Sequence, residues 1–293
     1  MTSGNRSGSW TIREVLDWTA GHLATNGSDT ARLDADLLLA HALKVERIHL
    51  YMDPDRPLTR DERDAYRELV RARAAGTPVA HLLGRRDFWS LALAVSPAAL
   101  IPRPDTEAVV EVALARLPEA DPARALDLGT GTGCIAAALA TERPALTVDA
   151  VEASPEAAAL ARGNIERLDL AERLRVLEGD WLEPVAGEAF DLIVANPPYV
   201  PEADPHLDSG DVAAEPREAL AAGPDGLDAY RAIIPAAPAH LLPGGWLVLE
   251  IGWDQGDAVR ALLEEAGFTE AAIRPDYGGR DRVAEARWPG TAA

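Results

Sequence analysis

From Arg124 to Arg287, short apolar runs of strand length alternate with longer segments of helical character. This alternation predicts parallel strands, because a helix between two strands returns the chain to the same edge of the sheet. Ligands bind at the carboxyl ends of the strands in such sheets, so the residues there form the candidate site. The pattern predicts an α/β protein with a doubly wound, mostly parallel, seven-stranded sheet, with strands at residues 125–128, 146–151, 175–177, 190–195, 246–251, 271–274 and 282–287.

The N-terminal part of the chain has helical patterns and no strand pattern. Two capping boxes, Thr11–Glu14 and Thr59–Glu62, predict the starts of two helices. Ser28 or Asp29 is expected to cap another helix between them. These segments predict a small helical bundle.

A change of pattern separates this bundle from the α/β part. Residues 87–101 alternate imperfectly and predict a hairpin. Pro102 and Pro104 then fix an extended segment, after which Asp105 or Thr106 is expected to cap a helix. We therefore predict three parts: a helical bundle at residues 1–85, a hairpin and linker at residues 86–107, and an α/β domain at residues 108–293.

The charge of the chain is unevenly distributed. The formal net charge is −20, and residues 1–90 contain 13 basic and 13 acidic side chains, whereas residues 91–293 contain 15 and 35. This acidity argues against a nucleic-acid partner, since phosphate binding requires Lys and Arg. The chain has no apolar run of membrane-spanning length, and Met1–Ser9 lacks the apolar core of a secretory signal. A cytoplasmic protein with no membrane partner is expected.

A glycine-rich loop follows the strand expected at residues 125–128 and precedes a helix. It consists of Gly129, Thr130, Gly131, Thr132 and Gly133. Glycines at this place let a ligand approach the backbone at the helix N-terminus. Glu152 ends the next strand, where a carboxylate can accept hydrogen bonds from both hydroxyls of a ribose. A dinucleotide site is one interpretation, although the loop does not have the Gly-x-Gly-x-x-Gly spacing.

The strand expected at residues 190–195 ends in Asn196-Pro197-Pro198-Tyr199. The two prolines have no N–H to donate, so they end the strand ladder and leave backbone carbonyls available as acceptors. The Asn196 side chain adds another acceptor, and Tyr199 adds an aromatic face. This combination predicts a site for a planar group that carries an –NH₂.

These motifs together resemble those of class I S-adenosylmethionine methyltransferases. The wider pattern resembles the HemK/PrmC family, which are protein-(glutamine-N5) methyltransferases that act on peptide chain release factors. The resemblance runs in order from about residue 84 to residue 282, and the helical N-terminal part also fits. Its matching stretches are Gly84–Phe88, Ile101–Glu107, Leu126–Ile135, Asn196–Tyr199, Glu215–Leu220, Pro243–Gly245, Glu250–Gly252 and Gly278–Arg282.

The resemblance implies a role for each motif. Gly129–Gly133 is expected to line the methionine part of the cofactor, Glu152 to hold the ribose hydroxyls and Trp181 to lie beside the adenine. Asn196 is expected to face both cofactor and substrate. The substrate glutamine is expected to be held by Asn196, Pro197, Pro198 and Tyr199, of which Asn196, Pro197 and Tyr199 are the candidate catalytic residues.

The resemblance further implies that S-adenosylmethionine is the methyl donor, that S-adenosylhomocysteine is the product and that no metal takes part. The implied protein substrate is a release factor, and the implied process is translation termination. Two alternatives use the same kind of site: a glutamine methyltransferase of a ribosomal protein, and an adenine-N6 methyltransferase of nucleic acid. The acidic α/β part disfavours the second alternative.

Overall fold

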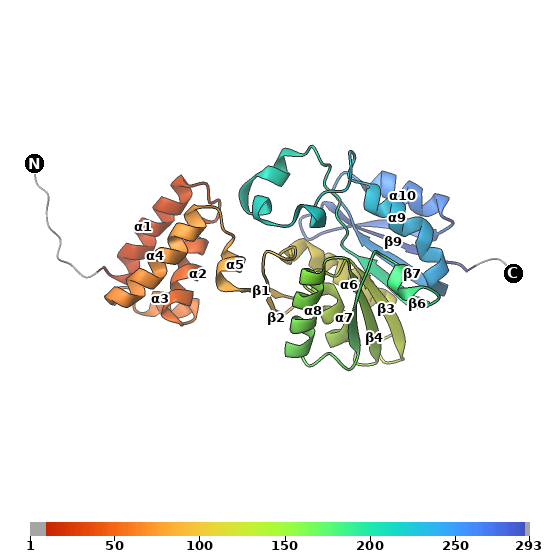
Figure 1. Ribbon diagram of the computed structural model, residues 1–293, viewed down its shortest axis with the longest axis horizontal. Coiled ribbons are helices and arrows are strands. Elements are labelled where there is room, and N and C mark those ends of the chain that lie inside the picture. Colours follow the sequence, from red (N-terminus) through yellow and green to blue (C-terminus); the bar gives the residue numbers. More distant parts are fainter. Residues whose placement is uncertain (1–9, 291–293) are drawn as a thin grey trace, which may run out of the picture. The chain divides into compact units, whose positions relative to one another are not determined.

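The computed structural model describes residues 10–290, so the expectation for Met1–Ser9 lies outside the described residues. The described chain forms two compact units (Figure 1). The first contains residues 10–84 together with the segment Asp208–Ala214. The second contains Arg85–Leu207 and residues 215–290. A segment from the middle of the sequence therefore belongs to the N-terminal unit.

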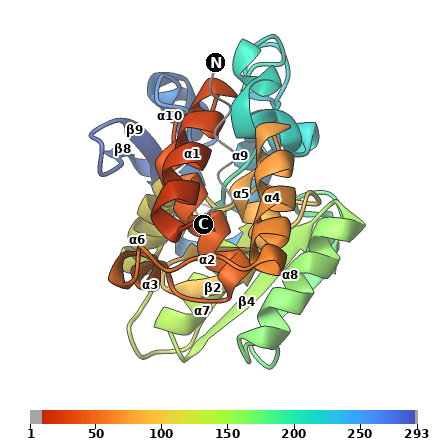
Figure 2. The same cartoon turned by 90° about the vertical axis from the view of Figure 1, so that its left-hand side faces the viewer.

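The first unit is a helical bundle whose helices α1, α2 and α4 lie side by side (Figure 2). Both predicted capping boxes are confirmed, at Thr11 and at Thr59. The predicted cap of the second helix is wrong, because the Ser28 and Thr30 hydroxyls donate to the Asp34 carboxylate instead of accepting from the helix end. The helices of this unit are α1 (Ile12–Thr25), α2 (Ala31–Leu43), α3 (Arg47–Met52), α4 (Arg60–Ala74) and α5 (Val79–Leu83).

The second unit contains a two-stranded hairpin and a seven-stranded sheet. The hairpin strands are β1 (Arg85–Phe88) and β2 (Leu91–Ala94), joined by Trp89 and Ser90, which both have positive φ. The sheet strands are β3 (Ala123–Leu128), β4 (Leu146–Glu152), β5 (Leu174–Glu178), β6 (Phe190–Ala195), β7 (Leu241–Glu250), β8 (Thr269–Pro275) and β9 (Asp281–Arg287). The α-helices are α6 (Glu107–Arg116), α7 (Cys134–Glu142), α8 (Pro155–Arg167), α9 (Asp228–Ala236) and α10 (Gly256–Glu265).

The strand order of the large sheet is β5-β4-β3-β6-β7-β9-β8. The strands from β5 to β7 are parallel, whereas β9 and β8 are antiparallel to their neighbours, which confirms the predicted mostly parallel sheet. The chain runs outward from β3 to β5 and then returns to β6 on the other side of β3. The switch point therefore lies between β3 and β6, where ligands bind in sheets of this kind.

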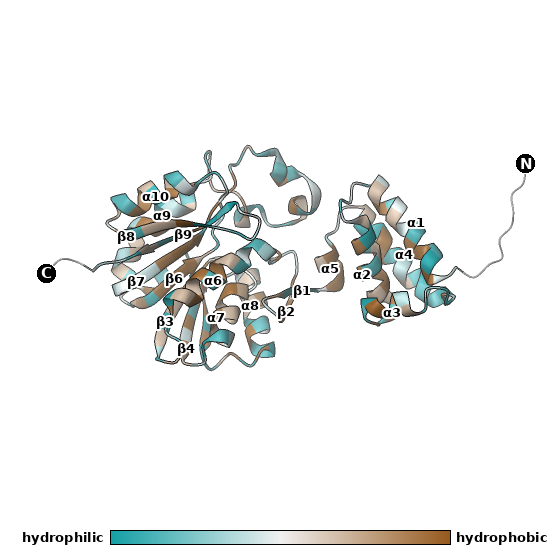
Figure 3. Cartoon of the chain, turned by 180° about the vertical axis from the view of Figure 1, so that it is seen from behind, coloured by the Kyte–Doolittle hydropathy of each residue, from teal (hydrophilic) through white to brown (hydrophobic). Residues whose placement is uncertain are grey.

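Buried apolar residues cover both faces of the sheet. On one face the strands pack against α6 and α7, and on the other against α9 and α10. Strand residues such as Leu126, Leu192 and Val248 are fully buried, and hydrophobic residues, brown in Figure 3, are abundant in the strands. Both faces are covered as expected for parallel strands, so the strand ends are the place where a ligand can reach the sheet.

Two local expectations from the sequence are wrong. The side chain of Thr106 makes no capping hydrogen bond at the start of α6, because its hydroxyl accepts a hydrogen bond from Asn196 instead. The strand β7 starts at Leu241 and includes Pro243–Gly245, which lie outside the strand predicted at residues 246–251. Among the described residues, every helix is too short or too polar to cross a membrane.

Candidate active site

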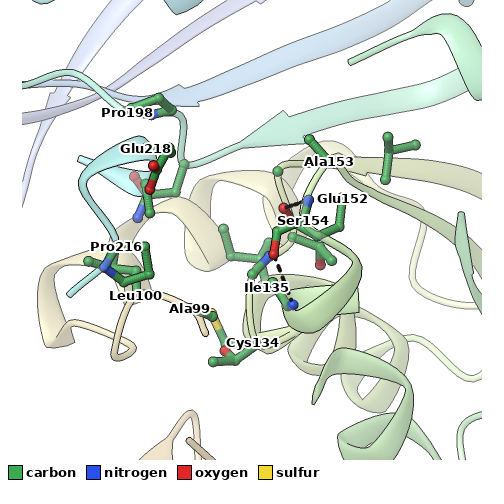
Figure 4. A pocket seen from close by; sticks show the side chains of 18 of the residues that line it. Ala99, Leu100, Cys134, Ile135, Glu152, Ala153, Ser154, Pro198, Pro216 and Glu218 are labelled. Atoms are coloured by element: carbon green, nitrogen blue, oxygen red, sulfur yellow. Dashed lines mark hydrogen bonds between the residues drawn. The ribbon is translucent and has the colours of Figure 1, made fainter. Parts of the chain in front are cut away.

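A pocket of about 550 Å³ lies at the carboxyl ends of β3, β4 and β6. Figure 4 shows Glu152 and Ser154 on one side of it and Pro198 and Glu218 on the other. The pocket brings together residues that are up to 69 positions apart in the glycine loop and the Asn196–Tyr199 segment. The residues predicted from the sequence that line it are Gly129, Thr130, Gly131, Thr132, Glu152, Trp181, Asn196 and Pro198.

Three of the predicted site residues do not line this pocket: Gly133, Pro197 and Tyr199. Gly133 has φ +81° and precedes α7, where a Cβ would lie 3.5 Å from Ala161. The Tyr199 side chain points its hydroxyl at Glu250, at 3.2 Å. The predicted stacking of Tyr199 on a substrate amide stays a prediction.

The glycine loop has a backbone shape that suits glycine. Gly129 and Gly131 have φ values of +66° and +57°, in the left-handed region that other residues rarely adopt. Trp181 covers the loop, since a Cβ on Gly129 would lie 3.6 Å from the Trp181 ring. Because Gly129 and Gly131 have no side chains, the loop backbone and the Trp181 ring both face the same pocket.

Asp127, which precedes the loop, is a buried carboxylate. Its Oδ2 accepts hydrogen bonds from the Thr130 hydroxyl at 2.5 Å and from the Ala136 amide at 3.2 Å. Oδ1 has no hydrogen-bond partner in the described structure. Burial raises the pKa of Asp127 to about 7, and the two hydrogen bonds oppose that shift. Asp127 thus ties the loop to the start of α7.

Glu152 binds the glycine loop directly. Its Oε2 accepts from the Gly131 amide at 2.8 Å and its Oε1 accepts from the Ser154 amide at 2.9 Å. A carboxylate has about four acceptor positions, so two remain for a ligand. The geometry therefore adds a second role to the one expected, because Glu152 also fixes the loop that would contact the ligand.

The Asn196–Tyr199 segment is held by hydrogen bonds from both ends. The Leu220 carbonyl accepts from the Tyr199 and Val200 amides, at 3.1 and 2.9 Å. The Gln255 side chain donates to the Tyr199 carbonyl at 3.0 Å. At the other end, Asn196 Nδ2 donates to the Thr106 hydroxyl at 3.3 Å. These contacts fix the segment beside the pocket without using the Asn196 side-chain oxygen.

The linker from Ile101 to Thr106 forms part of the pocket wall. The buried side chain of Glu215 accepts from the Ile101 amide at 2.8 Å and forms an ion pair with Arg103. Pro216, which follows Glu215, also lines the pocket. The ion pair thus joins two segments that are distant in sequence but adjacent in the wall.

Thr106, Glu215 and Glu250 belong to the motifs given above, but the sequence predicted no role in the site for any of them. All three are at most 8% exposed and contact the pocket wall or the Asn196–Tyr199 segment. Glu250 is the last residue of β7, as Glu152 is of β4, but the predicted strand at residues 246–251 ran past it and hid its place at a strand end. Among the described residues, no group of three or more His, Cys, Asp or Glu side chains is placed to hold a metal ion.

This sheet order, with a glycine loop, an acidic strand end and an Asn-Pro-Pro-Tyr segment around one pocket, defines a class I methyltransferase. Residues 14–84 match the PrmC N-terminal domain, and residues 106–214 match the methyltransferase small domain. Curated relatives that are about half identical over most of this chain are release factor glutamine methyltransferases, and the chain belongs to that family.

Relatives in this family align over nearly their whole length. A release factor glutamine methyltransferase from Xylella fastidiosa is 51% identical, over 88% of this chain and 94% of its own. One from Geobacter sulfurreducens is 47% identical, over 95% and 97%. A methyltransferase structure from Pyrococcus furiosus has a TM-score of 0.51 at 21% identity, over 68% of this chain and 89% of its own, which supports the fold.

The contacts of Glu152 lead to a prediction about cofactor binding. We expect Glu152→Ala to weaken binding of S-adenosylmethionine by about 1.5–3 kcal/mol, because a charged acceptor is lost. Glu152→Gln keeps an oxygen acceptor and should weaken binding less. Calorimetry on both variants measures the effect, and an unchanged affinity in Glu152→Ala would remove Glu152 from the cofactor site.

Proposed function

We propose that this chain transfers a methyl group from S-adenosylmethionine to the side-chain amide nitrogen of a glutamine. The proposed glutamine lies in the Gly-Gly-Gln segment of peptide chain release factors, so the reaction supports translation termination. The proposal rests on the observation that the glycine loop and Asn196 line the same pocket. The relatives of this chain are named release factor glutamine methyltransferases, which supports the proposed substrate.

The residues of the pocket fit the proposed methyl donor. The loop from Gly129 to Gly133 would face its methionine part, Glu152 has acceptor positions left for the ribose hydroxyls, and Trp181 offers a ring beside the adenine. When bound, S-adenosylmethionine supplies an electrophilic methyl group. The proposed reaction requires no metal.

The proposed role of Asn196 and Pro197 follows from the chemistry of an amide. An amide nitrogen is a poor nucleophile because its lone pair is delocalised into the carbonyl. The Asn196 Oδ1 and the Pro197 carbonyl would accept the two amide hydrogens, which aims the nitrogen and stabilises the positive charge that develops on it. Tyr199 and Pro198 would contact the flat amide. The N-methylated amide cation is very acidic, so no general base is assigned.

Mass spectrometry of a treated release factor tests this function. Incubation with S-adenosylmethionine should add one methyl group, and fragmentation should place it on the glutamine of Gly-Gly-Gln. Ribosomal proteins and DNA treated in parallel test the two alternatives. A methyl group on another residue type, or on DNA, would refute the proposed substrate.

We also propose that the helical bundle binds the release factor outside its Gly-Gly-Gln segment. A short flexible segment offers few contacts and loses conformational freedom on binding, so affinity has to come from a second surface. The bundle offers apolar side chains for such a surface, because Ile48 and Met52 lie one turn apart on α3 and are both more than half exposed.

Substitutions on this surface test the docking role. We expect Ile48→Ser with Met52→Ser to reduce methylation of the intact release factor by roughly tenfold or more, since buried apolar contacts would be lost. Methylation of a free Gly-Gly-Gln peptide should change little, and this peptide is the control. An equal loss on factor and peptide would contradict the docking role but not the proposed activity.

A further inference from the structure

A buried carboxylate lies directly behind the Asn196–Tyr199 segment. Glu250 is the last residue of β7. The residue before it, Leu249, pairs with Ala195 of β6, so Glu250 and Asn196 come next to each other at the ends of neighbouring strands. Glu250 is 1% exposed. Its Oε1 accepts from the Tyr199 hydroxyl at 3.2 Å, whereas Oε2 has no hydrogen-bond partner in the described structure. A buried acceptor without a hydrogen bond lowers the stability of the folded chain, so a functional reason for this oxygen is expected.

Thr106 lies between Glu250 and Asn196. It is 1% exposed, and its hydroxyl oxygen accepts from Asn196 Nδ2 at 3.3 Å. The hydroxyl proton is still available for donation. Burial raises the pKa of Glu250 to about 7, and the adjacent Thr106 hydroxyl opposes that shift. A hydrogen bond from the Thr106 hydroxyl to Oε2 of Glu250 would give this proton an acceptor and the unused oxygen a donor.

We infer that Glu250 is a positioning residue that sets the orientation of the Asn196 side-chain amide through the Thr106 hydroxyl. When Glu250 is ionised, its carboxylate only accepts hydrogen bonds, so Thr106 has to donate to it. The Thr106 oxygen then accepts from the Asn196 –NH₂, which leaves Asn196 Oδ1 for the pocket. The inference rests on the proposed function, in which Oδ1 accepts a hydrogen of the substrate amide.

Charged and titratable groups from several elements surround Glu250. The buried guanidinium of Arg282 stabilises the ionised carboxylate, and the charge of Asp105 acts in the opposite direction. Tyr199 donates to the carboxylate, and Tyr230 donates to the Glu250 backbone carbonyl at 2.8 Å. The pKa of the Cys134 thiol is raised to about 12, mainly by burial, so this neighbour stays neutral.

Four variants separate positioning from general stability. Glu250→Gln keeps the shape but introduces an –NH₂ that donates, so Thr106 no longer has to donate toward position 250. Thr106→Val removes the hydroxyl, and Thr106→Ser keeps it. Glu285→Gln is the matched control, because Glu285 is also 1% exposed on a neighbouring strand but pairs with Arg116 and Arg274.

Turnover of a Gly-Gly-Gln peptide should fall about tenfold or more in Glu250→Gln and Thr106→Val, since each loses one oriented hydrogen bond. Thr106→Ser should recover most of the turnover that Thr106→Val loses, and Glu285→Gln should stay within about threefold of the unmodified chain. Cofactor affinity should be unchanged in Glu250→Gln and Glu285→Gln. Unchanged turnover in Glu250→Gln and Thr106→Val, or an equal loss in Thr106→Ser or Glu285→Gln, would overturn the inference.

A spectroscopic measurement tests the inference without an assay of methyl transfer. Exchange of the Asn196 –NH₂ protons with solvent, followed by NMR, should be slow in the unmodified chain and in Thr106→Ser but faster in Glu250→Gln and Thr106→Val. Equal exchange in all four proteins would overturn the inference. If the unmodified chain methylates no glutamine, the proposed function fails, and the exchange rates still show whether Glu250 orients Asn196.

Discussion

Replacement of Asn196 by alanine is expected to reduce turnover on the order of 100-fold or more, which is what the loss of one preorganised electrostatic partner costs. The physical reason is that Asn196 lines the pocket and its Nδ2 is held by Thr106, which leaves Oδ1 for the substrate amide. Most of the lost interaction would act on the reacting amide. We therefore expect only a small change in cofactor affinity.

Steady-state methylation of the Gly-Gly-Gln peptide measures this effect, and calorimetry measures cofactor affinity. Asn26→Ala is a suitable control, because Asn26 lies in the helical bundle and its side chain only donates to the His22 carbonyl at the end of α1. That variant should keep full turnover. Methyl transfer by Asn196→Ala at the rate of the control would show that the acceptor amide binds elsewhere.

The sequence predicted the architecture because its apolar runs and their separations are local properties. Parallel strands with intervening helices place Gly129, Glu152 and Asn196 at one edge of the sheet, and the structure confirms that they line one pocket. The register that puts Leu128 opposite Ala195 makes the glycine loop and Asn196 neighbours. That result required only the order of elements and the switch-point rule.

The contacts of Thr106 show what the sequence could not predict. Thr106 precedes a helix, which favours a capping role, but its hydroxyl bonds to a side chain 90 positions away. A threonine hydroxyl that could cap a helix locally can instead form a hydrogen bond with a buried side chain from a distant part of the sequence. The same limit applies to Asp208–Ala214, whose inclusion in the helical unit depends on contacts such as the ion pair between Arg73 and Asp211.

A second large effect is expected from Gly226→Ala. Gly226 has φ +75°, and a Cβ there would lie 2.3 Å from the Tyr199 carbonyl oxygen and 2.8 Å from Gln255 Nε2. Both neighbours are fixed, because Gln255 donates to the carbonyls of Tyr199 and Gly226. The backbone at Tyr199 therefore has to move, and it carries the segment that begins at Asn196.

Gly187→Ala provides the matched comparison, since Gly187 has φ +80° but nothing within 4 Å of an added Cβ. Both substitutions should cost about 1–2 kcal/mol for the left-handed backbone, and only Gly226→Ala should cost about 1–3 kcal/mol more for the clash. A shift of about 1 Å at a catalytic segment can cost about 100-fold in rate. Denaturant unfolding and peptide turnover measure both effects. Equal stability and equal turnover in the two variants would show that the Gln255 contacts do not hold Tyr199 in place.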